Sequence, residues 1–242
     1  MSFLEDIPGP FRQNLMASIA MVLYYKMALE LSCWIRLRWK RSIVSRNVLQ
    51  LFFSSTVIFW PYFDTSDWSW KFAILLPLVV FSRLVYKGAF LRDPTDLEVQ
   101  NWSLSSSPSE LLLGPVFLAA VFLWLTLYQF MTEESAIVAA VSFGDALAPL
   151  IGSRWGRHLY SVPFSKFKTM EGSVVGVFLG TIAASYFYMF MMGMTLLPLR
   201  IILAYAGIAA VAEGTAPGNC DNFVICVVLH FSIPRIQQLL PP

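Results

Sequence analysis

The chain has 242 residues, of which 57% are hydrophobic and only 13% are charged, with a formal net charge of +2. Soluble domains carry about 25% charged residues, so this composition and a mean hydropathy of +0.64 exclude an ordinary soluble domain. The chain is expected to be an integral membrane protein. Its small net charge gives no support for nucleic-acid binding, and its three cysteines form no CxxC pair.

Eight apolar runs follow one another along the chain. A spanning helix needs about 20 residues, or about 17 at the short end, and most of the runs reach that length. Period-two alternation is absent, so strands are not expected. We therefore predict one domain over residues 1–242, an all-α polytopic membrane bundle of seven to eight transmembrane helices. The runs are 15–35, 48–63, 72–91, 111–131, 136–152, 173–192, 196–213 and 222–240.

Basic residues gather in alternate connections between these runs. They occupy 36–46, 83–92 and 154–168, whereas the intervening connections after the second and fourth runs carry Asp64, Asp67 and the pair Glu133-Glu134. The positive-inside rule then places the basic connections in the cytosol. Residues 5 and 6 are acidic, which argues against a cleavable signal or transit peptide. We expect the endoplasmic reticulum membrane, with a plastid membrane as the alternative.

The first polar island lies at the end of the fifth run. Gly144, Ala148 and Gly152 recur every four residues and predict a small-residue face for close helix packing. Asp145 adjoins that face. It is either a cap or ion-pair partner inside the bundle, or a carboxylate that holds Mg²⁺ beside nucleotide phosphates.

A basic, glycine-punctuated loop follows. Glycines let a backbone approach a ligand closely, and amides with Arg or Lys make a phosphate cradle. A helix predicted to begin near Ser173 would add its N-terminus, which favours anions. Glu171 is a cap or a second metal ligand. The candidate phosphate-binding residues of this loop are Gly152, Arg154, Gly156, Arg157, His158, Lys166, Lys168, Thr169, Gly172 and Ser173.

A third polar island follows the seventh run. Glu213 ends that run, and Asp221 and Asn222 begin the next. The pair Asp221-Asn222 either caps the last helix or, with Glu213, returns carboxylates to the side that carries Asp145. Metal-assisted phosphoryl transfer needs a few carboxylates and cations around one point.

These islands together resemble the CTP-dependent lipid-alcohol kinases, which include phytol, farnesol and dolichol kinases and the CTP-using diacylglycerol kinase. The matching elements, over roughly 105–225, are Gly-Asp-Ala-x-Ala-x-x-Ile-Gly from Gly144, Lys-Thr-x-Glu-Gly-Ser from Lys168, and Glu213 with Asp221-Asn222. The segment Glu110–Pro115 is similar to the Glu-Leu-Leu-x-Gly-Pro element of the phytol kinases. The resemblance implies transfer of the γ-phosphate of CTP to a membrane lipid alcohol.

The resemblance also implies roles for individual residues. Asp145 and Asp221 would hold Mg²⁺, and Lys168 with Arg154 and Arg157 would neutralise the transferred phosphate. Glu213 or Asp221 would take the hydroxyl proton. The catalytic set is thus Asp145, Lys168, Glu171, Glu213 and Asp221. The nucleotide-binding set is the loop residues above other than Lys168, together with Gly144 and Asn222.

The chain departs from the phytol-kinase pattern at the start of its second run. The Arg-Lys-x-x-His element of those kinases is here Arg46, Asn47 and Gln50. Phosphatidate cytidylyltransferase is the nearest alternative, but its Gly-His-Gly-Gly element is absent. A transporter or an inactive membrane scaffold is the alternative of another class. Lys26 and Glu30, four residues apart, would mark a polar pathway or, more simply, an interior-facing couple.

Overall fold

The computed structural model describes residues 8–162, 165–217 and 220–240, and of residues 165–167 it describes the backbone alone. In these ranges the chain is almost entirely helical, as predicted. Its elements are α1 (Gly9–Trp39), α2 (Ser42–Ser54), η1 (Ser55–Tyr62), η2 (Trp68–Ile74), α3 (Leu75–Val85), η3 (Tyr86–Leu91), α4 (Leu97–Trp102), η4 (Pro108–Leu112), α5 (Gly114–Tyr128), α6 (Glu133–Trp155), β1 (Leu159–Val162), β2 (Ser165–Thr169), η5 (Gly172–Leu179), α7 (Gly180–Met191), α8 (Leu199–Thr215) and α9 (Asp221–Leu239).

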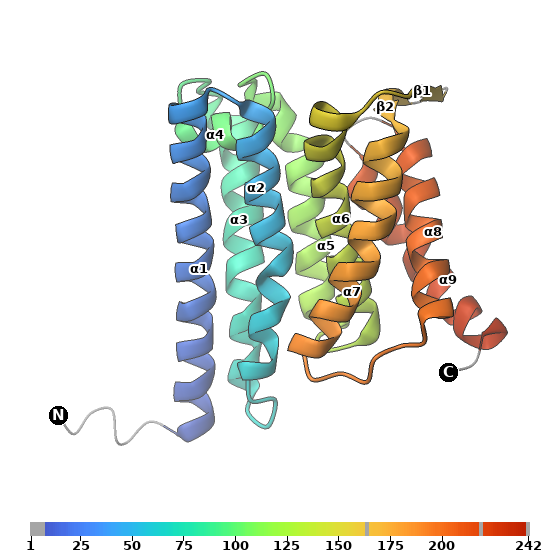
Figure 1. The fold of residues 1–242 in the computed structure, drawn as a ribbon. Coiled ribbons are helices and arrows are strands. Elements are labelled where there is room, and N and C mark those ends of the chain that lie inside the picture. Colours follow the sequence, from blue (N-terminus) through green and yellow to red (C-terminus); the bar gives the residue numbers. More distant parts are fainter. Residues whose placement is uncertain (1–7, 163–164, 218–219, 241–242) are drawn as a thin grey trace.

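Consecutive long helical segments run in opposite directions through the bundle (Figure 1). One end, at the top of that view, carries the α1–α2 connection, α4, the β-hairpin, the C-terminal end of α8 and the N-terminal end of α9. The three basic connections of the sequence therefore lie together, as charge counting predicted. We call this the basic end of the bundle.

Among the described residues, six helical segments are long and apolar enough to cross a membrane: 9–39, 42–62, 68–91, 108–128, 133–155 and 172–191. The prediction of seven to eight spans was therefore too high by this criterion. The last two apolar runs do form helices, but α8 has 17 residues, which is about 26 Å of helix against a hydrocarbon core of about 30 Å. Helix α9 is not among the six because its second half is polar: it carries His230, Arg235 and two glutamines.

Side-chain caps fix several helix starts. Asp96 accepts hydrogen bonds from the amides of Glu98 and Val99 at 2.9 and 3.2 Å and so begins α4. Thr132 accepts from the amide of Ser135 and begins α6, whose first turn also carries acidic residues. Acceptors and negative charge both stabilise the unpaired amides of a helix N-terminus. Such caps hold α4 and α6 in register with the ends of the bundle.

Helix α6 lies at the centre and packs on α2, η5, α7, α8 and α9. Its contact with η5 is very close, because a Cβ on Gly176 would stand 2.4 Å from the Cα of Ala148. A Cβ on Gly180 would stand 3.2 Å from the Cα of Gly144. The predicted small-residue face is therefore confirmed, and it places the end of α6 against the start of η5.

A two-stranded antiparallel sheet lies at the basic end, where the sequence had not led us to expect strands. Strand β1 pairs with β2 with Leu159 opposite Thr169 and Tyr160 opposite Lys168. The expectation failed because the argument against strands holds only inside lipid, whereas this hairpin projects beyond the helices (Figure 1).

Lys26 and Glu30 do not face the interior. Both side chains are exposed on the outer surface of α1, while Tyr25 and Ala28 on the same helix are buried. Neither charge has an ion-pair or hydrogen-bond partner among the described residues. The prediction of an interior-facing couple or of a polar pathway through the bundle was therefore wrong.

Candidate active site

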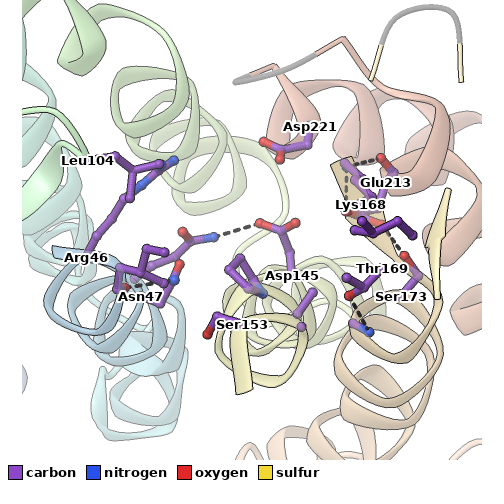
Figure 2. Close-up of a pocket in the computed structure, with 17 residues that line it drawn as sticks. Arg46, Asn47, Leu104, Asp145, Ser153, Lys168, Thr169, Ser173, Glu213 and Asp221 are labelled. Carbon is purple, nitrogen blue, oxygen red and sulfur yellow. Dashed lines mark hydrogen bonds and ion pairs between the residues drawn. The ribbon is translucent and has the colours of Figure 1, made fainter. Parts of the chain in front are cut away.

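A cavity of about 440 Å³ opens at the basic end between α2, α6, the β-hairpin, η5, α8 and α9 (Figure 2). Three chain segments that are far apart in sequence meet around it. Its lining residues are Ile43, Arg46, Asn47, Gln50, Leu104, Asp145, Ala148, Pro149, Gly152, Ser153, Leu159, Lys168, Thr169, Gly172, Ser173, Glu213 and Asp221.

Acidic groups dominate the inner wall of this cavity. The side chains of Asp145 and Asp221 point toward a shared space, with Lys168 and Glu213 beside them (Figure 2). Asp145 is only 7% exposed and Glu213 only 5%. Three carboxylates thus face two cationic side chains, Lys168 and Arg46. Excess negative charge around a partly buried space favours binding of a cation.

Asp145 is held by a residue from a different helix. The side-chain amide of Gln50 on α2 donates a buried hydrogen bond of 2.9 Å to Oδ2 of Asp145 on α6. Gln50 is itself 4% exposed. Because an amide donor fixes one carboxylate oxygen, the other oxygen of Asp145 is left to face the cavity.

Lys168 and Glu213 form an ion pair that joins the hairpin to α8. The Lys168 ammonium donates to Oε1 of Glu213 at 2.5 Å and also to the Glu213 backbone carbonyl. Burial lowers the pKa of Lys168, but the carboxylates of Glu213, Asp221 and Asp145 outweigh it, so that the pKa is raised. Lys168 therefore stays positively charged at the cavity wall.

A chain of hydroxyl groups extends this pair. Ser173 donates to Oε2 of Glu213 at 3.1 Å, and the Tyr160 hydroxyl lies 2.7 Å from Oγ of Ser173. A Cβ on Gly214 would stand 3.1 Å from the Tyr160 hydroxyl. Because residue 214 has no side chain, Tyr160 of β1 can approach α8. Both side-chain oxygens of Glu213 accept a hydrogen bond, Oε1 from Lys168 and Oε2 from Ser173.

Thr169 sits between α6 and η5. Its Oγ1 accepts a hydrogen bond of 3.1 Å from the amide of Gly172. A Cβ on Gly152 or on Gly172 would stand 2.5 or 2.8 Å from that Oγ1. The two glycines therefore make room for the threonine hydroxyl at the cavity wall, where its own O–H remains able to donate to a ligand.

The model of the cytidylyltransferase family matches residues 11–218 of this chain. The chain belongs to this family. It is 26% identical over 202 residues to a probable chloroplastic phytol kinase of Zea mays. The matched region is 81% of this chain and 65% of that protein. It is 36% identical over 92 residues to a phytol kinase of Synechocystis, covering 36% of this chain and 37% of that protein.

A probable phytol kinase of Oryza sativa is 32% identical over 126 residues, or 51% of this chain and 38% of that protein. These relatives confirm the resemblance to the lipid-alcohol kinases. The chain covers less than two thirds of the length of each of them. No solved structure matches the chain.

In this cytidylyltransferase-family chain, several predicted site residues lie outside the cavity. Arg154, Arg157 and His158 are exposed, and the guanidinium of Arg154 lies over the ring of Trp155. The ring of His158 is 2.7 Å from Glu171. The pKa of Glu171 is lowered to about 2, first by a hydrogen bond from the backbone N–H of Glu171 itself and then by the hydrogen bond with the His158 ring.

Three further predicted residues in the described part of the chain also lie outside the cavity lining. Gly144 lies under Val177 and Thr181 of the next helix, and Gly156 lies against Thr169, so both fill packing positions. Asn222 is buried beside the cavity residue Asp221, and its backbone N–H donates to Oδ1 of Asp221 at 3.0 Å. The side chain of Lys166 lies outside the described residues.

The structure also adds residues that the sequence did not single out as site residues. Arg46, Asn47 and Gln50 line the cavity from one face of α2. Gln50 follows Arg46 by four residues and Asn47 by three, and this spacing was a usable signal for a shared helix face. Ser153 lines the cavity as well. Tyr160 reaches it only through Ser173, and no sequence pattern indicated that contact.

The donor chemistry of the cavity fits Mg²⁺. No group of three or more His, Cys, Asp or Glu side chains in the described part of the chain is spaced to hold a metal ion alone. Mg²⁺ is usually bound through one or two carboxylates together with substrate phosphates, and Asp145 and Asp221 supply such a pair. The cavity is suited to a metal that arrives with its nucleotide.

Proposed function

We propose that the chain transfers the γ-phosphate of CTP to the hydroxyl group of a prenol-type membrane lipid alcohol such as phytol, farnesol or dolichol. One observation carries the proposal: Asp145, Lys168 and Asp221, from three separate segments, surround one cavity at the basic end of a membrane bundle. A soluble nucleotide approaches from the aqueous side, and the alcohol approaches from the bilayer.

Asp145 and Asp221 would hold Mg²⁺ with the nucleotide phosphates. When bound, the metal supplies positive charge to the phosphate oxygens. Gln50 keeps Asp145 oriented for this role. Lys168 and Arg46, the cationic residues of the lining, neutralise charge on the transferred group, and the Thr169 hydroxyl donates to a phosphate oxygen. Phosphoryl transfer depends mostly on such positioning and charge neutralisation.

In the transfer step, the oxygen of the lipid hydroxyl bonds to the γ-phosphorus, and the bond from that phosphorus to the β–γ bridging oxygen breaks. CDP leaves with the electron pair. We assign the hydroxyl proton to Glu213, which becomes available as an acceptor when Lys168 turns from it toward the phosphates. Ser173 and Tyr160 keep Glu213 in place meanwhile.

The lipid chain would lie in an apolar groove of about 500 Å³ between α2–η1 and α7. The groove includes Leu51, which follows the cavity residue Gln50 on α2. It extends to Ile58, about 12 Å deeper along the helix.

We further propose that the basic end faces the cytosol, following the positive-inside rule. The membrane is that of the endoplasmic reticulum or of a plastid, and the word chloroplastic in the names of the plant relatives favours the latter. A fluorescent fusion distinguishes the two organelles.

A substrate panel tests the activity. Purified protein would be given CTP or ATP with phytol, farnesol, dolichol or diacylglycerol. A phosphorylated prenol formed with CTP supports the proposal, phosphatidate points to a diacylglycerol kinase, and a CDP-lipid points to a cytidylyltransferase. Nucleotide binding without turnover of any alcohol points to an inactive scaffold.

A further inference from the structure

An exposed row of side chains runs along the outer surface of α1. Its members are separated alternately by three and four residues, and the half-buried Cys33 completes the alternation. They are Met16, Ile19, Leu23, Lys26, Glu30 and Leu37. This spacing, sustained over three heptads, is that of a helix seam that packs against a second helix with a left-handed crossing.

The two charged members of this row lie deep in the membrane. Near one end of α1, Asn14 donates to the carbonyl of Asp64 in the connection between η1 and η2. Near the other end, Arg36 donates to Ser106 in the connection at the basic end. Lys26 is therefore about 18 Å from the first anchor and about 15 Å from the second along the helix. It stands close to the middle of the bilayer, with Glu30 one turn above.

Neither charge has a hydrogen-bond or ion-pair partner in the described chain, and both face outward. Charged side chains in a bilayer almost always pair or face a protein interior, because lipid does not solvate them. Helix α1 forms an edge of the bundle in Figure 1. Its other side packs on α2, α3, α4, η1 and η2. The row thus lacks the covering that its charges require.

We propose that this row is a dimer interface, in which α1 packs in parallel against α1 of a second copy of the chain. In a two-fold arrangement Lys26 of each copy meets Glu30 of the other, so that one patch satisfies both charges. A second copy fits because the row is self-complementary: it carries one positive and one negative residue, one turn apart, between apolar residues.

Cross-linking in native membranes tests this interface. In a background with Cys33, Cys220 and Cys226 changed to alanine, Leu23→Cys would be compared with Leu31→Cys, an exposed residue of α1 that lies off the row. Two differently tagged full-length copies are coexpressed and oxidised. We expect several-fold more disulfide-linked product carrying both tags from Leu23→Cys. Equal yields from the two positions, or a product with one tag and a foreign protein, would overturn the proposal.

Exchanging the charges of Lys26 and Glu30 distinguishes ion pairing across the interface from nonspecific association. In the Leu23→Cys background, Lys26→Glu or Glu30→Lys alone should reduce the linked product several-fold, since like charges then meet. The double exchange Lys26→Glu with Glu30→Lys should restore it. If the single exchanges leave the yield unchanged, or if the double exchange does not restore it, the charges do not pair across an interface.

Discussion

The side-chain amide of Gln50 on α2 donates a 2.9 Å hydrogen bond to Oδ2 of the buried Asp145 on α6. The two residues are 95 positions apart in the chain, so the contact couples separate helices at the floor of the cavity. This hydrogen bond fixes the orientation of the Asp145 carboxylate inside the bundle.

Replacing Gln50 should weaken catalysis without unfolding the bundle. Groups that orient a metal-ligating carboxylate typically contribute about 10–100-fold in metal affinity or activity. We expect Gln50→Ala to lower the transfer rate within that range and to raise the Mg²⁺ concentration needed for half-maximal rate. Ser54→Ala is a matched control, because Ser54 lies one turn after Gln50 on α2, does not line the cavity, and donates to backbone carbonyls of its own helix. An unchanged Mg²⁺ requirement in Gln50→Ala would argue against orientation of Asp145 by Gln50.

Removing the carboxylate charges should have larger effects. We expect Asp145→Asn and Asp221→Asn each to reduce the rate by about 10²–10³-fold, the range seen when one preorganised electrostatic contact is lost. Asp67→Asn, at the start of η2 at the opposite end of the bundle, should keep full activity, since asparagine also caps a helix. Rates measured at saturating CTP decide the matter, and wild-type activity in Asp145→Asn would refute the metal assignment.

The ion pair between Lys168 and Glu213 predicts a pH dependence. The pKa of Lys168 in the folded protein lies above its usual value of 10.5. The stability from this pair is therefore fully present below that usual value and is lost as the pH rises through the folded pKa. In Glu213→Gln the largest of the raising interactions is gone while burial remains, so the folded pKa of Lys168 falls and the alkaline loss of stability should be smaller than in the wild type. Thermal unfolding in detergent from neutral to alkaline pH measures this difference.

The control for that measurement is Lys168→Met, which has no titrating group at this position. Its melting temperature should lack the alkaline decline that belongs to the pair. If Glu213→Gln and the wild type lose the same stability at alkaline pH, Glu213 does not set the pKa of Lys168.

The groove between α2–η1 and α7 predicts a lipid-specific effect. Ala183 lies exposed in this groove, and Ala183→Trp should fill it. We expect the KM for the prenol to rise several-fold while the KM for CTP stays unchanged. Ala120→Trp is the matched control, because it fills a second apolar groove of about 320 Å³ between α5 and α9. A rise in the prenol KM with Ala120→Trp alone would place the lipid chain in that other groove.

The close packing of α6 on η5 predicts a stability change. In Gly176→Ala the new methyl group would meet the Ala148 backbone at 2.4 Å, and such overpacking typically costs about 1–3 kcal/mol. Gly207→Ala, in α8, has no atom within 4 Å of the added group and should stabilise the helix by about 0.5–1 kcal/mol. Detergent-based unfolding compares the two. Equal stability of both variants would contradict the close approach.

The helical class and the gathering of polar islands at one end could be predicted from sequence, because both follow from run length and charge placement. The small-residue face from Gly144 to Gly152 was predicted from four-residue spacing and is confirmed by its contact with Gly176. The number of spans was not, because the polar second half of α9 and the short α8 depend on where each helix begins and ends.

Contacts between segments that are distant in the chain could not be predicted from the sequence. Gln50 was visible only as a departure from a family pattern, and its bond to Asp145 depends on how α2 lies against α6. The pairing of Tyr160 with Ser173 depends on a hairpin that was not predicted. The spacing of Lys26 and Glu30 correctly placed them one turn apart, but hydrophobic pattern alone did not show which face of a largely apolar helix turns outward.

The most direct measurement follows the phosphate itself. Purified protein in micelles would be incubated with CTP labelled in its γ-phosphate and with phytol, farnesol or dolichol, with Asp145→Asn as the matched variant. We expect label in a prenyl phosphate, release of CDP, and loss of the label transfer in Asp145→Asn. Pyrophosphate release with a CDP-lipid product, or undiminished transfer by Asp145→Asn, would contradict this expectation.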